Sequence, residues 1–381
     1  MFNKIFSVST FIASGCLAPL AAFAHPDAHS IADTALKQPA KIVDCTLENG
    51  ESAKCAAYTV KFLPETLEIG PFCPATLDET GGVWDWDGEN AGLYRIDRAY
   101  LEMLSELGYT FFNDDGEVNV FDIRIEGPEA DNECIAGSLD TNADMSITAL
   151  IPVSPQMAQS PTPLGTVSKI GMGLDGVPVF ADAPSVLDTG HMPALDTCGG
   201  HVDPGGWYHW HATATDIDTV FEKENVDATC AHVKQDQTAQ FGYAFDGFAL
   251  FGSREADGTL PVGLDDCGGH VGPVAGQEGE VYHYHASESF PNLPTCLVGV
   301  VAQDNFTTTA AQGIGSANGK GGPGGGRPDF SEPAKALGIE PSDLMNAIRA
   351  EGGRDADLGK VAERLGISKD ALEAAMPARR P

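Results

Sequence analysis

Short stretches of alternating apolar and polar residues recur along the chain, and they predict a mainly β architecture. Residues 58–63 and 118–125 both read as strands, with β-branched and aromatic residues at alternate positions. Residues 96–107 instead repeat their apolar side chains at helical spacing. The short strands and the frequent Gly, Pro and Asp-Gly turns favour a sandwich or a barrel-like fold for residues 42–311.

Two of these stretches are interrupted by an Asp-Gly pair, which predicts β-hairpins. One spans residues 170–180 and turns at Asp175, and the other spans residues 241–252 and turns at Asp246. Each hairpin is followed by Cys-Gly-Gly-His, then by two histidines around one aromatic residue, and then by a cysteine. The same unit is therefore written twice, which predicts a pseudo-symmetric pair with one shared core.

Six of the 10 histidines lie in these two units. Successive side chains of a strand point to opposite faces, so the two histidines of each pair share a face and the aromatic residue faces away. Neutral imidazole is a common ligand of transition metals. We predict metal binding by two triplets, which are His201, His209, His211 and His270, His283, His285. The pattern leaves open whether each triplet holds its own ion, whether both share one site, and whether the histidines only pack.

Neighbouring polar residues are candidates for orienting these imidazoles. A metal-bound histidine usually donates its other N–H group to a carboxylate or a carbonyl, and Asp175 and Asp246 are candidates for that role. The alternative is that both aspartates only shape the hairpin turns. Tyr208, Tyr282 and Tyr284 could donate hydrogen bonds or act as acids if they turned towards the histidines.

Residues 282–285 read Tyr-His-Tyr-His, and the chain resembles the YHYH domain family, which is named for this motif. In the first copy Trp210 replaces the second tyrosine, and both histidines remain. The resemblance covers about residues 149–301 and includes the hairpins, the Cys-Gly-Gly-His turns and the terminal cysteines. It supports the domain assignment, and the family name itself implies no settled activity.

The first 24 residues look like a secretory signal. Lys4 precedes a mostly apolar stretch, and Ala-Phe-Ala before residue 25 fits a cleavage site, so we predict a periplasmic or secreted protein. A lipoprotein anchored through Cys16 is less favoured, because the partial lipobox lacks its usual leucine. No other stretch is long and apolar enough for a transmembrane segment.

Eight of the nine cysteines follow the predicted signal, and in an oxidising compartment an even number predicts disulfides. Their order and the repeat favour four pairs, which are Cys198–Cys230, Cys267–Cys296, Cys45–Cys55 and Cys73–Cys134. Eight cysteines allow 105 connectivities, so this pairing is a preference. A thiolate metal site is the alternative, although the sequence contains no C-x-x-C motif.

The chain divides by composition into further segments. After the signal we predict a disordered lead-in (25–41), a β-rich N-terminal subdomain (42–148), the duplicated domain (149–311), a Gly-rich linker (312–330) and a helical tail (331–381). The tail is itself duplicated, with Gly338 and Gly366 suited to helix ends and Ser342 and Ser368 suited to helix starts. We interpret it as a spacer or as a module for binding a protein partner.

The formal net charge of −33 argues against nucleic acid as a partner, because the phosphates would be repelled. Three functions remain open. The protein could bind copper or zinc, it could be a metal-dependent hydrolase or copper oxidase of unknown substrate, or it could be a disulfide-stapled structural or adhesion module with packed histidines. Metal binding is favoured because it requires the fewest features beyond the triplets.

Overall fold

The computed structural model describes residues 31–65, 67–124, 131–274, 279–317, 331–339, 344, 347 and 358–375. The predicted signal with Cys16 lies outside this range, as does Ser342. The described part is mainly β, as predicted, and its strands form an eight-stranded sheet with several smaller sheets. Among these residues, no helix has both the length and the apolar character that crossing a bilayer requires.

The eight-stranded sheet contains both repeat units. Its strands are β9 (Lys169–Gly173), β10 (Pro178–Phe180), β12 (Gly200–Val202), β13 (Tyr208–Trp210), β14 (Gln240–Ala244), β15 (Ala249–Phe251), β16 (Gly269–Pro273) and β17 (Glu280–His285). Their order is β12-β13-β10-β9-β14-β15-β17-β16, so each strand of the first unit mirrors its counterpart in the second. The two units join where β9 runs antiparallel to β14, with Met172 opposite Tyr243. The sheet is open, and the two histidine-bearing hairpins form its two edges.

Both predicted Asp-Gly hairpins are present. Asp175 Oδ1 accepts the Val177 N–H at 2.9 Å, and Asp246 Oδ1 accepts the Phe248 N–H at 3.2 Å. The glycine that follows each aspartate has a positive φ, 80° in the first turn and 94° in the second. Side chains other than glycine rarely adopt this backbone conformation, which explains why the pair marks these turns.

A four-stranded sheet contributes to the same body. It consists of β1 (Leu36–Thr46), β2 (Ser52–Lys61), β7 (Ser146–Pro152) and β19 (Phe306–Thr308), in that order. Tyr58 from β2 shares one buried cluster with Met172, Phe180 and Trp207 of the duplicated domain. The boundary predicted between residues 148 and 149 therefore runs through a common core.

β1 corrects the prediction of a disordered lead-in (25–41) for residues 31–41, while residues 25–30 lie outside the described residues. The strand starts at Leu36, and Ile31 and Ala35 before it are buried. The Ala32 N–H donates to the Leu174 carbonyl at 2.8 Å. These contacts order a segment that contains few large apolar residues.

Residues 312–317, predicted as the start of the Gly-rich linker, make contacts with the folded body. Gln312 Nε2 donates to the Pro204 carbonyl at 2.9 Å, and the Ile314 N–H donates to Asp203 Oδ2 at 3.4 Å. Gly313 is buried. Small residues allow this close backbone packing, so residues 312–317 belong to the folded body.

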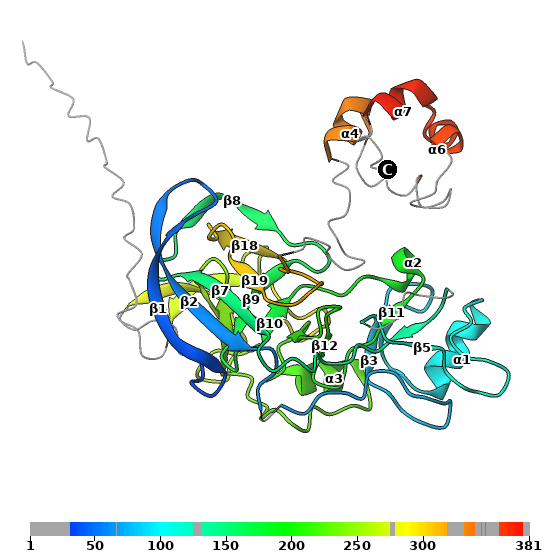
Figure 1. Cartoon of the computed structure of the whole chain (residues 1–381), viewed down its shortest axis with the longest axis horizontal. Helices are drawn as coiled ribbons and strands as arrows, with labels where there is room; N and C mark the ends of the chain where they lie inside the picture. The colour runs from blue at the N-terminus through cyan, green and yellow to red at the C-terminus, as the bar shows by residue number, and fades with distance from the viewer. Residues whose placement is uncertain are drawn as a thin grey trace, which may run out of the picture.

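A further group of elements forms a lobe with its own hydrophobic cluster, which Figure 1 shows at the end of the body opposite β1. The group comprises β3 (Val83–Trp86), β4 (Gly92–Arg95), α1 (Arg98–Glu106), β5 (Val120–Phe121), β6 (Cys134–Ile135), α2 (Val186–Thr189) and β11 (Met192–Pro193). α1 confirms the predicted helix, and Asp97 caps it by accepting the Tyr100 N–H at 3.0 Å. The strand predicted over residues 118–125 is shorter, because Asp122 Oδ1 accepts the Arg124 N–H at 3.0 Å and turns the chain.

The remaining elements are β8 (Met157–Pro163) paired with β18 (Cys296–Gly299), α3 (Ile217–Glu224), and the tail helices α4 (Ser331–Leu337), α6 (Leu358–Leu365) and α7 (Lys369–Ala375). The tail helices enclose a small cluster of their own, and Figure 1 shows them apart from the sheets. Gly338 and Gly366 have the positive φ expected after a helix end, and Ser368 Oγ accepts the Ala371 N–H at 3.2 Å.

Candidate metal centres

The first histidine group lies on the hairpin β12–β13. His201 and His209 face each other across the two strands, and His211 follows β13 directly. The Nε2 atom of His201 is 3.1 Å from that of His209 and 3.1 Å from that of His211, and the latter two are 3.0 Å apart. Three imidazole nitrogens therefore converge on one point, as the spacing of the residues predicted.

The other ring nitrogens show where the protons are. Nδ1 of His201 is 3.2 Å from the Pro193 carbonyl, and Nδ1 of His211 contacts the Ala181 carbonyl. A carbonyl oxygen only accepts, so both Nδ1 atoms carry the proton and both Nε2 atoms present lone pairs. A proton on Nε2 of His209 could meet only one of these two lone pairs. Without a cation, the centre of this group is short of donors.

Burial keeps these rings neutral. His209 and His211 are only 2% and 1% exposed. Burial lowers the pKa of His201 to about 4, and it lowers the pKa of His209 and His211 well below the usual value for histidine. Protonating one of the rings to supply the missing donor is therefore unfavourable, whereas a metal ion binds the neutral form of each ring.

The spacing of the three nitrogens also fits a metal. A metal at a typical Zn–N distance of about 2.0–2.1 Å from all three would lie about 1 Å outside their plane. That position leaves a fourth direction open. Three protein nitrogens with an open position is the arrangement found at metal sites that also take water or a small ligand.

The second group lies on the hairpin β16–β17. His270 faces His283 across the strands with their Nε2 atoms 3.2 Å apart, and His285 ends β17. In this group the Nδ1 atom of every ring contacts a carbonyl, that of Val262 at 3.0 Å for His270, Val281 at 3.0 Å for His283 and Gly252 at 2.8 Å for His285. All three Nε2 atoms therefore present lone pairs. Burial, the largest cause, lowers the pKa of both His283 and His285.

A carboxylate completes the second group. Glu255 Oε1 lies 3.1 Å from His270 Nε2, and Oε2 lies 3.8 Å from His285 Nε2. One atom from each of these two histidines, from His283 and from Glu255 lies within 4.8 Å of the others. Both groups could thus hold a metal ion, the first with three nitrogens and the second with three nitrogens and one oxygen.

The two groups are separate. β13 and β17 are five strand-to-strand steps apart in the sheet, which corresponds to about 24 Å at the usual spacing of about 4.8 Å. The pseudo-symmetry that could have brought both triplets to one ion instead places them at opposite edges. The sequence left open whether the two triplets form separate sites or one shared site. The structure contains a separate triplet in each unit.

Comparison with known families covers part of this region. Residues 148–260 match the model of a family described as YHYH protein. This segment is a YHYH domain. The match includes the first histidine group and both Asp-Gly hairpins, and it ends before residues 282–285, where the second copy carries the motif. No curated protein and no solved structure matches the chain.

Within and beyond this YHYH domain, the aromatic residues of the motif are each anchored by an aspartate. Tyr208 donates to Asp196 at 2.7 Å and Tyr282 to Asp265 at 2.9 Å, in equivalent positions of the two units. The other two pairs are Trp210 to Asp175 at 3.0 Å and Tyr284 to Asp246 at 2.6 Å. The aromatic residues thus lie on the face of the sheet that points away from the histidines.

This arrangement corrects the roles predicted for Asp175, Asp246 and the three tyrosines beside the metal. The aspartates hold the aromatic residues, and backbone carbonyls accept from the imidazoles instead. Burial raises the pKa of Asp175 to about 6. Burial, followed by Asp246, raises the pKa of Tyr284 far above its usual value, so its hydroxyl keeps its proton and is no acid near neutral pH.

We predict that Tyr284→Phe destabilises the fold by about 1–3 kcal/mol, because it leaves buried polar groups without partners. The Tyr284 hydroxyl donates to Asp246 and also accepts the Val298 N–H at 2.8 Å. Urea denaturation of the variant should show a lower midpoint. Tyr94→Phe is the control, because the Tyr94 hydroxyl donates to the Asn90 carbonyl at the surface. Equal stability of Tyr284→Phe and the wild type would contradict the anchoring role.

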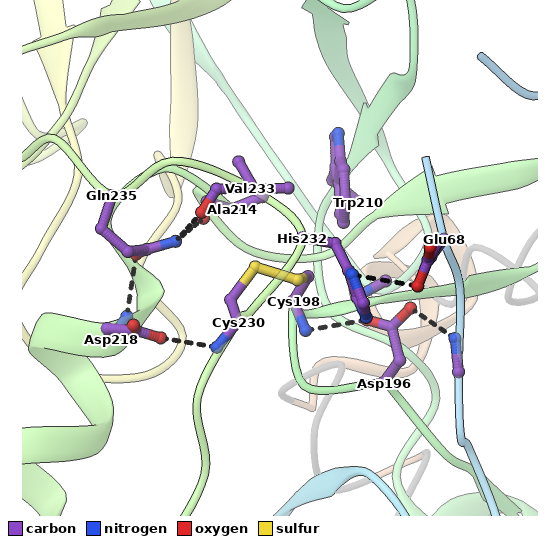
Figure 2. The surroundings of a disulfide bond; sticks show 12 residues. Glu68, Asp196, Cys198, Trp210, Ala214, Asp218, Cys230, His232, Val233 and Gln235 are labelled. Carbon is purple, nitrogen blue, oxygen red and sulfur yellow. Dashed lines mark hydrogen bonds and ion pairs between the residues drawn. A yellow bond between two sulfur atoms is a disulfide. The ribbon is translucent and has the colours of Figure 1, made fainter. Parts of the chain in front are cut away.

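All four predicted disulfides are present, and one closes each histidine unit. Figure 2 shows Cys198–Cys230, where Asp196 Oδ1 accepts the Cys198 N–H at 2.9 Å and Asp218 Oδ1 accepts the Cys230 N–H at 2.7 Å. Asp196 therefore fixes both the disulfide and Tyr208, which lies on β13 next to His209. The disulfide connects the turn before His201 to the chain after α3.

One member of the candidate sites escaped the sequence analysis. Glu255 lies in the loop between β15 and β16, where the two units no longer resemble each other. The repeat drew attention to shared residues, and a ligand present in only one copy has no counterpart to reveal it. Its position 15 residues before His270 carries no recognised ligand spacing.

Proposed function

We propose that the protein is exported and binds copper or zinc at two separate sites of its eight-stranded sheet. The observation that carries the proposal is the convergence of Nε2 lone pairs in both groups. In the second group all three Nδ1 atoms contact carbonyls, so no imidazole proton faces the centre. Nitrogen ligands with at most one carboxylate suit copper and zinc better than calcium or magnesium.

The main alternative is that the histidines only pack. A histidine in a protein core normally satisfies its two ring nitrogens with one donor and one acceptor. In the first group the nearest partners of each Nε2 are two other Nε2 atoms, and the rings of His209 and His211 are buried. Folding would leave this arrangement strained unless a cation occupied it, which favours metal binding over packing.

Two further features support an exported location and a binding role. Four disulfides suit an oxidising compartment, in line with the predicted signal at residues 1–24. The histidines sit on disulfide-closed hairpins, and five of the six Nδ1 atoms contact a backbone carbonyl, so most of the ligands are pre-positioned. Holding a metal requires nothing more than this, whereas the hydrolase and oxidase alternatives also require a substrate site.

Metal analysis of the untagged protein tests the proposal. We expect protein purified from the periplasm to contain copper or zinc, and the metal-free protein to take up two equivalents with submicromolar affinity. Inductively coupled plasma mass spectrometry gives the metal content, and competition against a chromophoric chelator gives the affinity. No bound metal, together with no affinity for copper or zinc tighter than micromolar, would rule the proposal out.

A further inference from the structure

The two histidine groups differ in one ligand. Among the described residues, the first group contains no carboxylate, while Glu255 lies within the second. Each group contains one partly exposed histidine, His201 or His270, and the second group adds Glu255, whose side chain is 22% exposed. The two sites therefore offer a metal ion different charges and different surroundings.

Glu255 is held in place by a compact loop. Its N–H donates to the Thr259 carbonyl at 2.9 Å, and its carbonyl accepts the Gly258 N–H at 2.8 Å. The preceding Arg254 donates to Glu288 at 2.7 Å. In the first unit the chain after β10 leads instead to α2, which Ser185 caps. The loop with the glutamate is thus a feature of the second unit.

The carboxylate also needs a cation. Glu255 Oε1 lies 3.1 Å from His270 Nε2, and the proton of that ring is on Nδ1, which contacts the Val262 carbonyl. Two acceptors at this distance repel each other unless a metal ion or a second imidazole proton lies between them. A metal ion would relieve this contact and the convergence of the three Nε2 lone pairs together.

The two sites should therefore favour metal ions of different charge. In the first group all ligands are neutral and the surroundings include the rings of Phe180 and Trp207, both 5.0 Å from the His209 ring. A divalent ion there would keep its full charge in an apolar setting unless an anion such as hydroxide took the open fourth position, because no protein ligand of this group is charged. A monovalent ion carries half that charge. In the second group the carboxylate offsets one charge of a divalent ion.

We propose that Glu255 is a metal ligand that makes the second site selective for a divalent ion such as Zn(II), and that the first site takes monovalent Cu(I). This inference rests on the proposed function of metal binding. Glu255 supplies the fourth ligand of a tetrahedral Zn(II) site, for which three imidazoles and one carboxylate oxygen are a suitable set. Three imidazoles alone suffice for Cu(I), which accepts three-coordinate geometry.

The test uses the full-length chain with Glu255→Gln, and Glu280→Gln as the matched control. Glu280 is an exposed carboxylate at the start of β17, outside the ligand group. Zn(II) is titrated against a chromophoric chelator, and Cu(I) is titrated anaerobically against a Cu(I)-specific chelator. Glu255→Gln should weaken Zn(II) affinity at the tighter site by roughly 10–100-fold or more. Loss of a partner that only supports a metal ligand already has an effect of this size. The Cu(I) affinity of this variant should change less than threefold, and the control should change neither.

The possible results separate the two proposals. Unchanged Zn(II) affinity in Glu255→Gln overturns the ligand role and leaves Glu255 as an ion-pair partner of His270. Absence of both Zn(II) and Cu(I) binding in the wild type instead defeats the proposed function itself. If Glu255→Gln does not fold, Glu255→Asp keeps the charge with a shorter reach. That variant should retain the preference for Zn(II) with weaker binding, and an unchanged affinity would again overturn the proposal.

Discussion

Replacing His209 and His211 with alanine should remove one of the two bound metal ions and leave the other in place. The first group then keeps a single imidazole, while the second group lies at the opposite edge of the sheet with its ligands unchanged. Metal content should fall from two equivalents to one. A bound ion stabilises the folded state by about 4 kcal/mol when its free concentration is about 1,000 times the Kd, so the melting temperature should fall as well.

The reciprocal variant, His283→Ala with His285→Ala, should remove only the other ion. His232→Ala is the matched control, because His232 pairs with Glu68 at 3.1 Å and belongs to neither group. Its metal content should equal that of the wild type. Loss of both ions from a folded double variant would mean that the sites are coupled, and a fall in stability with no change in metal content would mean that the histidines are structural.

Replacing Cys198 and Cys230 with serine should lower the free energy of unfolding by about 3–4 kcal/mol. The disulfide closes a loop with a sequence separation of 32 residues, and the loss of chain entropy in the unfolded state accounts for most of this figure in the usual model. The loop contains His201, His209 and His211, so the first site should also bind metal more weakly. Guanidinium denaturation gives the stability, and chelator competition gives the affinity.

The disulfide Cys45–Cys55 provides the control for this prediction. It also joins two cysteines, but it crosslinks β1 to β2, far along the chain from both histidine groups. Serine at both positions should cost about 2–3 kcal/mol, because the loop is shorter, and should leave both metal affinities unchanged. If the Cys198–Cys230 variant bound metal as tightly as the wild type, the disulfide would hold the fold without holding the site.

Local sequence signals predicted the parts of the fold that local chemistry determines. The Asp-Gly pairs placed both hairpins, because their glycines require a positive φ. The repeat and the cysteine order gave the four disulfides. The N-terminal region was harder, because β7 pairs with both β2 and β19, and no local pattern indicates which distant strands will be neighbours.

In the candidate sites, too, local patterns predicted some residues, while residues placed by distant contacts were missed. The alternation of a strand placed each His-x-His pair on one face and put Trp210 and Tyr284 on the other. The same alternation argues against Asp175 and Asp246 as partners of the histidines, since the aspartates meet the aromatic residues. Glu255 comes from a loop whose path depends on tertiary contacts such as the Arg254–Glu288 pair, and nothing in its local sequence reveals that path.

The mirrored strand order has a consequence for the origin of the chain. A protein with a single unit would expose β9 as an edge strand, and two copies could satisfy those edges by pairing antiparallel about a twofold axis. The junction of β9 and β14, with Met172 opposite Tyr243, has the geometry of such an interface within one polypeptide. The present sheet therefore corresponds to a homodimer fused end to end. Within one polypeptide the two halves can differ in sequence, so a loop such as the one carrying Glu255 can change in one half alone.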